Sequence, residues 1–158
     1  MAKKSNNLTS VTGEYYVCAE LGKRGILALL TPKNNPLFDI VAVSPDASRT
    51  VTIQVKTMSE RNNQGWKLGM DICTRKNNPL LFTVLVNLTG SQIEYYVYEY
   101  DILSERVEKS YSDYLIKPKR DGGSRKDIAF RWFDIKQFTK DDHSRKNNWD
   151  ILGFKKNV

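Results

Sequence analysis

The stretch Thr50-Val51-Thr52-Ile53-Gln54-Val55-Lys56-Thr57 alternates polar and apolar side chains from Thr50 to Lys56. Successive side chains of a β-strand point to opposite faces of a sheet, so its three apolar residues are expected to face a core. The polar residues, with Gln54 and Lys56 two positions apart, are expected to share the other face. The stretch therefore predicts a half-buried strand over 50–57.

The segments before this strand predict a helix followed by two further strands. Apolar residues at helical spacing predict a helix over 8–23, and residues 1–7 are expected to form a flexible tail. Apolar runs over 26–31 and 37–43 predict strands, because the turn-forming sequence Lys-Asn-Asn-Pro separates them. These three strands are expected to form a meander that is covered on one face by the helix.

The segments after it complete an α/β domain. Leu80–Asn87 is apolar enough for a central strand buried on both faces, and a hairpin through residues 89–91 leads to a strand over 93–100. A helix is predicted over 102–116. Residues 58–79 fit a short strand, a helix or both. With no linker between two halves, residues 1–158 are expected to form one α/β domain, with a mixed central sheet flanked by helices.

The composition limits the classes of protein to which the chain can belong. It has 158 residues and a formal charge of +7, with two cysteines and one histidine. Two cysteines are too few for a disulfide scaffold, so a cytoplasmic protein is expected. Apolar runs are too short to cross a bilayer, so no membrane association is expected. The lone His143 excludes most histidine-rich zinc sites.

The charge is distributed unevenly along the chain. Residues 94–113 contain six acidic and two basic groups, whereas the rest contains 12 acidic and 23 basic groups, a balance of +11. A basic surface attracts a polyanion, and nucleic acid is the leading candidate. The loop after the second helix is especially basic, and its cations are expected either to clamp a phosphate backbone or to form a solvated loop. They are Lys117, Lys119, Arg120, Arg125 and Lys126.

Four residues form the most informative candidate site. Asp39 lies in an apolar segment, where an unpaired carboxylate is costly, and a hairpin between 37–43 and 50–57 would bring it close to Gln54 and Lys56. Glu14 on the first helix is within reach of the same place. Carboxylate, amide and carbonyl oxygens suit a hard cation such as Mg²⁺. Taken singly, each of these residues is more often an ordinary surface residue.

These motifs resemble those of the restriction-endonuclease-like superfamily, the PD-(D/E)xK nucleases. The matching residues lie in Gly13-Glu14-Tyr15, Phe38-Asp39-Ile40 and Ile53-Gln54-Val55-Lys56-Thr57. More narrowly, Trp66-Lys67-Leu68 and Asn147-Asn148-Trp149 resemble a group of small bacterial nuclease-fold proteins. The resemblance spans residues 8 to about 100 and implies the α-β-β-β-α-β core of that superfamily.

The resemblance also implies roles for the candidate residues. Asp39 would be the principal ligand of Mg²⁺ or Mn²⁺, with Gln54 and the Val55 carbonyl as further ligands. Lys56 would be the catalytic lysine and Glu14 an accessory acid. The implied activity is hydrolysis of phosphodiester bonds, with DNA favoured over RNA. A homodimer is left open, because nucleases of this fold often pair to cut two strands.

One residue departs from the pattern of the superfamily. Gln54 stands where a second acidic residue is usual, so the site has one negative charge fewer. This leaves an alternative, in which the chain keeps the nuclease fold with weak or no catalysis. Such a protein would bind nucleic acid, or would use the acidic segment 94–113 to bind another protein.

Overall fold

The central five-stranded sheet is organised around the strand predicted from the alternating stretch. The computed structural model describes residues 6–33 and 35–155. The sheet has the order β1-β2-β3-β5-β6, in which β3 (Thr50–Met58) pairs antiparallel with β2 (Ile40–Val43) and parallel with β5 (Leu81–Asn87). The edge strands β1 (Leu27–Leu30) and β6 (Glu94–Glu99) pair antiparallel with their neighbours. The expected fold class, a mixed α/β domain with helices flanking a mixed sheet, is confirmed.

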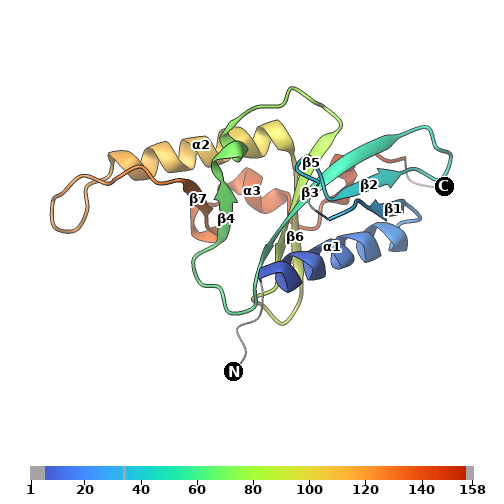
Figure 1. The fold of residues 1–158 in the computed structure, drawn as a ribbon, viewed down its shortest axis with the longest axis horizontal. Helices are drawn as coiled ribbons and strands as arrows, with labels where there is room; N and C mark the ends of the chain where they lie inside the picture. Colours follow the sequence, from blue (N-terminus) through green and yellow to red (C-terminus); the bar gives the residue numbers. More distant parts are fainter. Residues whose placement is uncertain (1–5, 34, 156–158) are drawn as a thin grey trace.

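Helix α1 (Asn6–Lys23) covers one face of this sheet (Figure 1). Val17 and Leu21 of the helix are fully buried, and they pack in one core cluster with Ile53 and Val55 of β3. The helix begins at Asn6, so the predicted tail extended two residues too far. The remaining tail, residues 1–5, lies outside the described residues.

The other face packs against α2 (Tyr100–Ile116) and a small second sheet of β4 (Trp66–Gly69) and β7 (Phe130–Phe133). Trp66, Tyr98 and Leu103 are among the fully buried residues of this second core cluster. All seven residues of β5 are buried, as expected for a strand covered on both faces. Figure 1 shows that the chain leaves the end of α2 as a long loop, which extends away from the body and returns as β7.

The connection from β3 to β5 differs from the core of the superfamily. The resemblance to that superfamily predicts an α-helix in this connection. The structure instead has β4 and the 3-10 turn η1 (Met70–Cys73). Trp66 and Leu68 are buried while Lys67 between them is exposed, so this segment has the two-residue period of a strand. The long second helix, α2, follows β6 instead.

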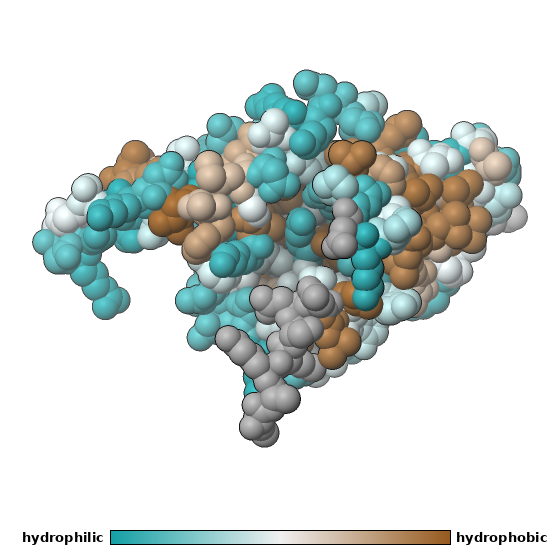
Figure 2. Space-filling view, viewed as in Figure 1, coloured by the Kyte–Doolittle hydropathy of each residue, from teal (hydrophilic) through white to brown (hydrophobic). Residues whose placement is uncertain are grey.

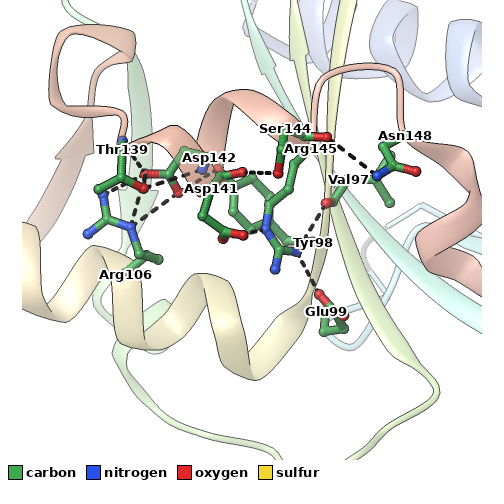
Figure 3. A network of polar contacts seen from close by, with 10 residues as sticks. All are labelled: Val97, Tyr98, Glu99, Arg106, Thr139, Asp141, Asp142, Ser144, Arg145 and Asn148. Atoms are coloured by element: carbon green, nitrogen blue, oxygen red, sulfur yellow. Dashed lines mark hydrogen bonds and ion pairs between the residues drawn. The ribbon is translucent and has the colours of Figure 1, made fainter.

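The C-terminal segment is held to β6 and α2 by a cluster of polar contacts (Figure 3). It includes the 3-10 turn η2 (Ile135–Gln137), the short helix α3 (Lys140–Ser144) and the 3-10 turn η3 (Trp149–Leu152). Asp142 is fully buried, and its carboxylate accepts hydrogen bonds from the Tyr98 hydroxyl (3.0 Å) and the Arg106 guanidinium (2.7 Å). Burial alone would raise the pKa of Asp142, but hydrogen bonds from Arg106 and Thr139 outweigh it and hold the pKa below its ordinary value.

None of the helices that the structure describes combines the length and the apolar character needed to cross a membrane.

Helix α1 packs closely against β3 at Gly13. A Cβ atom built on Gly13 would lie 1.9 Å from Thr57 Oγ1, so no side chain larger than hydrogen fits there without a shift. Gly13 also precedes the candidate residue Glu14. The close approach therefore sets the position of Glu14 relative to the end of β3.

We predict that Gly13→Ala lowers the free energy of unfolding by about 1–3 kcal/mol, because the helix must move away from Thr57. Urea denaturation monitored by circular dichroism measures this change. The matched control is Gly22→Ala, since a Cβ on Gly22 meets nothing within 4 Å. That variant should be neutral or gain up to about 1 kcal/mol from the helix preference of alanine. Equal stabilities of the two variants would contradict the prediction.

Candidate functional site

Asp39 lies where β2 and β3 separate. The antiparallel strand β2 begins at Ile40, one residue after Asp39, so the predicted strand over 37–43 began three residues too early. The Asp39 N–H still donates to the Ile53 carbonyl at 2.9 Å. Beyond that point the Asp39 side chain takes over as hydrogen-bond partner of β3, since its Oδ2 accepts from the Val55 N–H at 2.7 Å.

This hydrogen bond also fixes where the Val55 carbonyl lies. In an extended strand the N–H and C=O of one residue are directed to the same edge. Because the Val55 N–H meets Asp39, the Val55 carbonyl also lies on the edge of β3 that faces Asp39. The structure thus brings together the Asp39 carboxylate and the backbone of Val55, two of the three predicted metal ligands.

The buried Gln54 side chain, the third predicted ligand, is already bonded within the protein. Its Nε2 donates to the Leu37 carbonyl at 3.2 Å, and the residue is 8% exposed. Only the amide nitrogen can donate to a carbonyl oxygen, so the Gln54 amide oxygen points away from Leu37. Gln54 therefore stabilises the segment that carries Asp39, and a carboxylate in its place would not make this bond.

Lys56 is half-buried on the same face of β3 as Gln54. Val55 packs in the core cluster with α1 and Met58 in the opposite one, so strand alternation places Gln54 and Lys56 on the face away from α1. Within the part of the chain that the structure describes, the Lys56 ammonium makes no hydrogen bond or ion pair. It lies one residue along β3 from the Val55 N–H that Asp39 holds.

Glu14 shares a cavity of about 180 Å³ with Asp39. Burial raises the pKa of Glu14, the negative charge of Asp39 raises it further, and Lys33 opposes the rise. Two carboxylates that face one cavity and repel each other favour a cation between them. Gln54 and Lys56 do not line this cavity. The four predicted residues therefore form two pairs, with Glu14 and Asp39 at the cavity and Gln54 and Lys56 on β3.

The chemistry of these donors fits a hard divalent cation. Two carboxylates and a strand carbonyl offer oxygen ligands, and Mg²⁺ commonly completes its shell with water. Across residues 6–33 and 35–155, no group of three or more His, Cys, Asp and Glu side chains is placed to hold a metal ion by itself. Any cation here would therefore depend on amide, carbonyl or water oxygens in addition to Glu14 and Asp39.

The sequence reasoning missed Thr31 and Lys33, which line the same cavity. The Thr31 hydroxyl donates to the Phe38 carbonyl at 2.9 Å, and its N–H donates to the Asp39 carbonyl at 2.9 Å. Thr31 thus holds the backbone of Asp39 on the side that faces β1, opposite β3. The available signal was a hydroxyl residue between an apolar strand and the turn that begins at Pro32.

The predicted nucleic-acid-binding residues lie on the long loop between α2 and β7, at the far left of Figure 1. We call residues 117–126 the basic arm. A turn shapes it, in which Lys119 N–H donates to the Gly123 carbonyl at 2.9 Å. The Arg125 guanidinium stacks 4.2 Å from the Tyr114 ring and donates to the Lys117 carbonyl. Lys117, Lys119, Arg120 and Lys126 are exposed.

Comparison with solved structures finds the same fold in a nuclease. The structure is similar to that of a bacterial homing endonuclease, I-Ssp6803I, with a TM-score of 0.56 at 14% identity, over 94% of this chain and 93% of the other. At that identity the likeness concerns the fold. No protein-family model matches the sequence, and a search of curated proteins finds no match.

Four of the six acidic groups in segment 94–113 are engaged within the protein, and one of them, Asp101, accepts hydrogen bonds from the N–H groups of Lys76 and Asn77. Glu94, Glu99 and Glu105 form ion pairs with Lys146, Arg145 and Arg75, respectively. Four tyrosines at the start of the same segment are buried and serve core packing. They are Tyr95, Tyr96, Tyr98 and Tyr100.

We predict that Gln54→Glu lowers the free energy of unfolding in EDTA by about 1–3 kcal/mol, because it sets a carboxylate oxygen against the Leu37 carbonyl. Urea denaturation at pH 7 provides the measurement. Gln92→Glu, at an exposed position, serves as control and should change stability little. Equal stabilities of Gln54→Glu and the parent would show that the amide bond to Leu37 does not stabilise the site.

Proposed function

We propose that this protein is a metal-dependent nuclease of the PD-(D/E)xK superfamily, which hydrolyses phosphodiester bonds of DNA. The observation that carries the proposal is the Asp39 carboxylate, bonded to the Val55 N–H and facing the same cavity as Glu14. The similar fold of a bacterial homing endonuclease supports it. The two cysteines are free thiols, in keeping with the reducing cytoplasm as the proposed compartment.

In this proposal Asp39 and Glu14 bind Mg²⁺ or Mn²⁺ together with the Val55 carbonyl. When bound, the cation supplies Lewis-acid charge to the phosphate that is cleaved. The two carboxylates hold a site of concentrated negative charge ready for it. Ion binding offsets their mutual repulsion, which is part of the reason that the pKa of Glu14 is raised.

Lys56 acts on the phosphate rather than on the cation. Lys56 follows Val55 on β3, and in this proposal its positive charge stabilises the negative charge that develops on phosphate oxygens. Thr31 and Gln54 act through other groups. Thr31 bonds to the Asp39 carbonyl and Gln54 to the Leu37 carbonyl, and these bonds keep the Asp39 carboxylate aligned with β3.

We predict that Asp39→Asn abolishes cleavage while the fold survives. The asparagine side-chain oxygen can still accept from the Val55 N–H, but the charge that attracts the cation is lost. The rate of cleavage of supercoiled plasmid in Mg²⁺ or Mn²⁺ should fall roughly a hundredfold or more, and EDTA should abolish cleavage by the parent. Mn²⁺ should raise the melting temperature of the parent and not that of the variant.

The charge-matched control is Asp113→Asn on α2, which should cut like the parent. The nuclease proposal fails if the parent does not cut in either metal. It also fails if Asp39→Asn cuts as fast as the parent.

The second candidate function is nucleic-acid binding without turnover. The observation that favours it is the engagement of Gln54 with Leu37 at the position where active enzymes of the superfamily usually have an acid. Binding would then depend on the cations of the basic arm. Lys119 and Arg120 are the clearest candidates, since both are exposed and Arg125 is already stacked on Tyr114.

We predict that the protein retards DNA in gel shifts in EDTA, with affinity that falls steeply as salt rises. Replacing Lys119 and Arg120 together by alanine should reduce the slope of log affinity against log salt by about 2. The control replaces Lys109 and Lys140, which are exposed cations on α2 and α3, and should leave the slope nearly unchanged. An affinity independent of salt would exclude a phosphate-dominated interface.

A further inference from the structure

The small sheet of β4 and β7 has one face toward the core and another that carries an exposed cation beside two aromatic rings. Trp66 and Phe133 lie opposite each other in the register, and both are buried in the second core cluster. Side chains alternate along a strand, so the next opposite pair, Lys67 and Trp132, lies on the other face together with Phe130. In the described structure, Phe130 and Trp132 are half-buried and lie outside both core clusters. We call Lys67, Phe130 and Trp132 the outer face of the small sheet.

The three side chains of the outer face contact one another. The Lys67 ammonium lies 4.1 Å from the centroid of the Phe130 ring. The rings of Phe130 and Trp132 meet edge to face, with their centroids 5.8 Å apart. The outer face therefore combines two ordered rings with a positive charge.

The indole N–H of Trp132 differs from those of the other two tryptophans. The Trp66 N–H donates to the Val86 carbonyl at 3.1 Å, and the Trp149 N–H is buried without a partner. Over residues 6–33 and 35–155, the Trp132 N–H donates to no group, and it is not one of the buried atoms. A tryptophan on a surface thus keeps its polar group available to a ligand, as is typical of tryptophans at interfaces.

The basic arm leads directly into the outer face. Lys126 lies four residues before Phe130, so at most about 14 Å of extended chain separates them. Lys67 and Lys126 are both exposed. Figure 2 shows hydrophilic surface on the arm and hydrophobic surface at its base, where Figure 1 places β7. Cations and aromatic rings therefore follow one another along a single stretch of surface.

The acidic residues on either side of β7 are engaged by the protein itself. Asp127 forms an ion pair with Arg131 (3.3 Å) and accepts from the Tyr111 hydroxyl (2.8 Å). The Arg131 guanidinium also stacks 3.7 Å from the centroid of the Tyr111 ring, which joins β7 to α2 and fixes the base of the arm. Asp134 accepts from the Lys136 N–H at 3.1 Å and caps η2. These contacts offset the negative charge beside the outer face.

We propose that the outer face stacks the unpaired bases of single-stranded DNA, while the basic arm binds the phosphates of the same strand. Aromatic rings next to cations are the usual means of binding single strands. Bases within a duplex are stacked on their neighbours, so an unpaired segment is the occupant that uses both the rings and the cations. The Asp71 carboxylate lies against Gly69, opposite Phe130, so Trp132 is the expected stacking residue. This inference rests on the nucleic-acid binding that both candidate functions share, and it narrows the substrate to DNA with an unpaired segment.

Binding in EDTA, where no metal-dependent cleavage occurs, tests the proposal with a single-stranded oligothymidylate and a duplex of the same length. The parent should bind the single strand roughly tenfold more tightly than the duplex at one salt concentration. Trp132→Ala should lower the affinity for the single strand roughly tenfold and leave that for the duplex nearly unchanged. Trp132→Phe keeps an aromatic ring and should restore most of the affinity.

Tryptophan fluorescence gives a second measurement, which does not depend on the folding of the alanine variant. Trp66 and Trp149 are only 1% and 6% exposed, so quenching of the parent by the single strand reports on Trp132. Trp132→Phe should bind without this quenching. The control is Tyr16→Ala, which removes a ring that is 40% exposed on α1 and should match the parent in affinity and quenching.

The proposal is overturned if the parent binds the duplex as tightly as the single strand, or if Trp132→Ala binds the single strand like the parent. It is also overturned if Trp132→Phe retains the quenching. A parent that binds both forms equally, with an affinity that falls as salt rises, contradicts base stacking and leaves nucleic-acid binding standing. A parent that binds neither form contradicts both.

Discussion

The structure depends on the change of partner along β3. That strand pairs with β2 over Thr50–Ile53 and with β5 over Thr52–Met58, so the pairing with β2 stops before Val55. At that point a side-chain oxygen of Asp39 replaces a strand as the partner of the backbone. The same event that ends one ladder therefore creates the candidate site. Thr31 and Gln54 hold the Asp39 segment on its two sides, and Gly13 allows α1 to bring Glu14 to the cavity.

The site contains features that lower the stability of the fold, and the packing around it offsets them. Glu14 and Asp39 repel each other, and Thr57 Oγ1 is buried without a hydrogen-bond partner in the described structure. Both features reduce stability, and the closely packed cores on the two faces of the sheet offset them. Such a pattern is common where a protein keeps charged groups in place for binding. The Arg106–Asp142 cluster is different, since its buried charges are fully paired and fasten the C-terminal segment.

Local patterns in the sequence predicted the parts of the fold that depend on local periodicity. The alternation over 50–57, the apolar run of β5 and the helical spacing of α1 each specify their own element. The strand β4 was ambiguous because only its pairing with β7, more than sixty residues away, decides its conformation. At the site, the order of Glu14, Asp39 and Gln54 was informative. The bond from Gln54 to Leu37 was not, because it depends on how the chain turns before β2.

The outer edge of β6 is covered by residues 145–147, so it is covered only late in synthesis. The residues that cover this edge lie about fifty positions further along the chain. On the ribosome, β6 and its neighbour β5 are made well before Asn147 emerges, so the outer edge of β6 is open for part of the synthesis of the chain. Partly made chains in one polysome are close together, and open strand edges favour pairing between them. Residues 145–147 therefore protect the edge of β6 from pairing with neighbouring chains once they have been made.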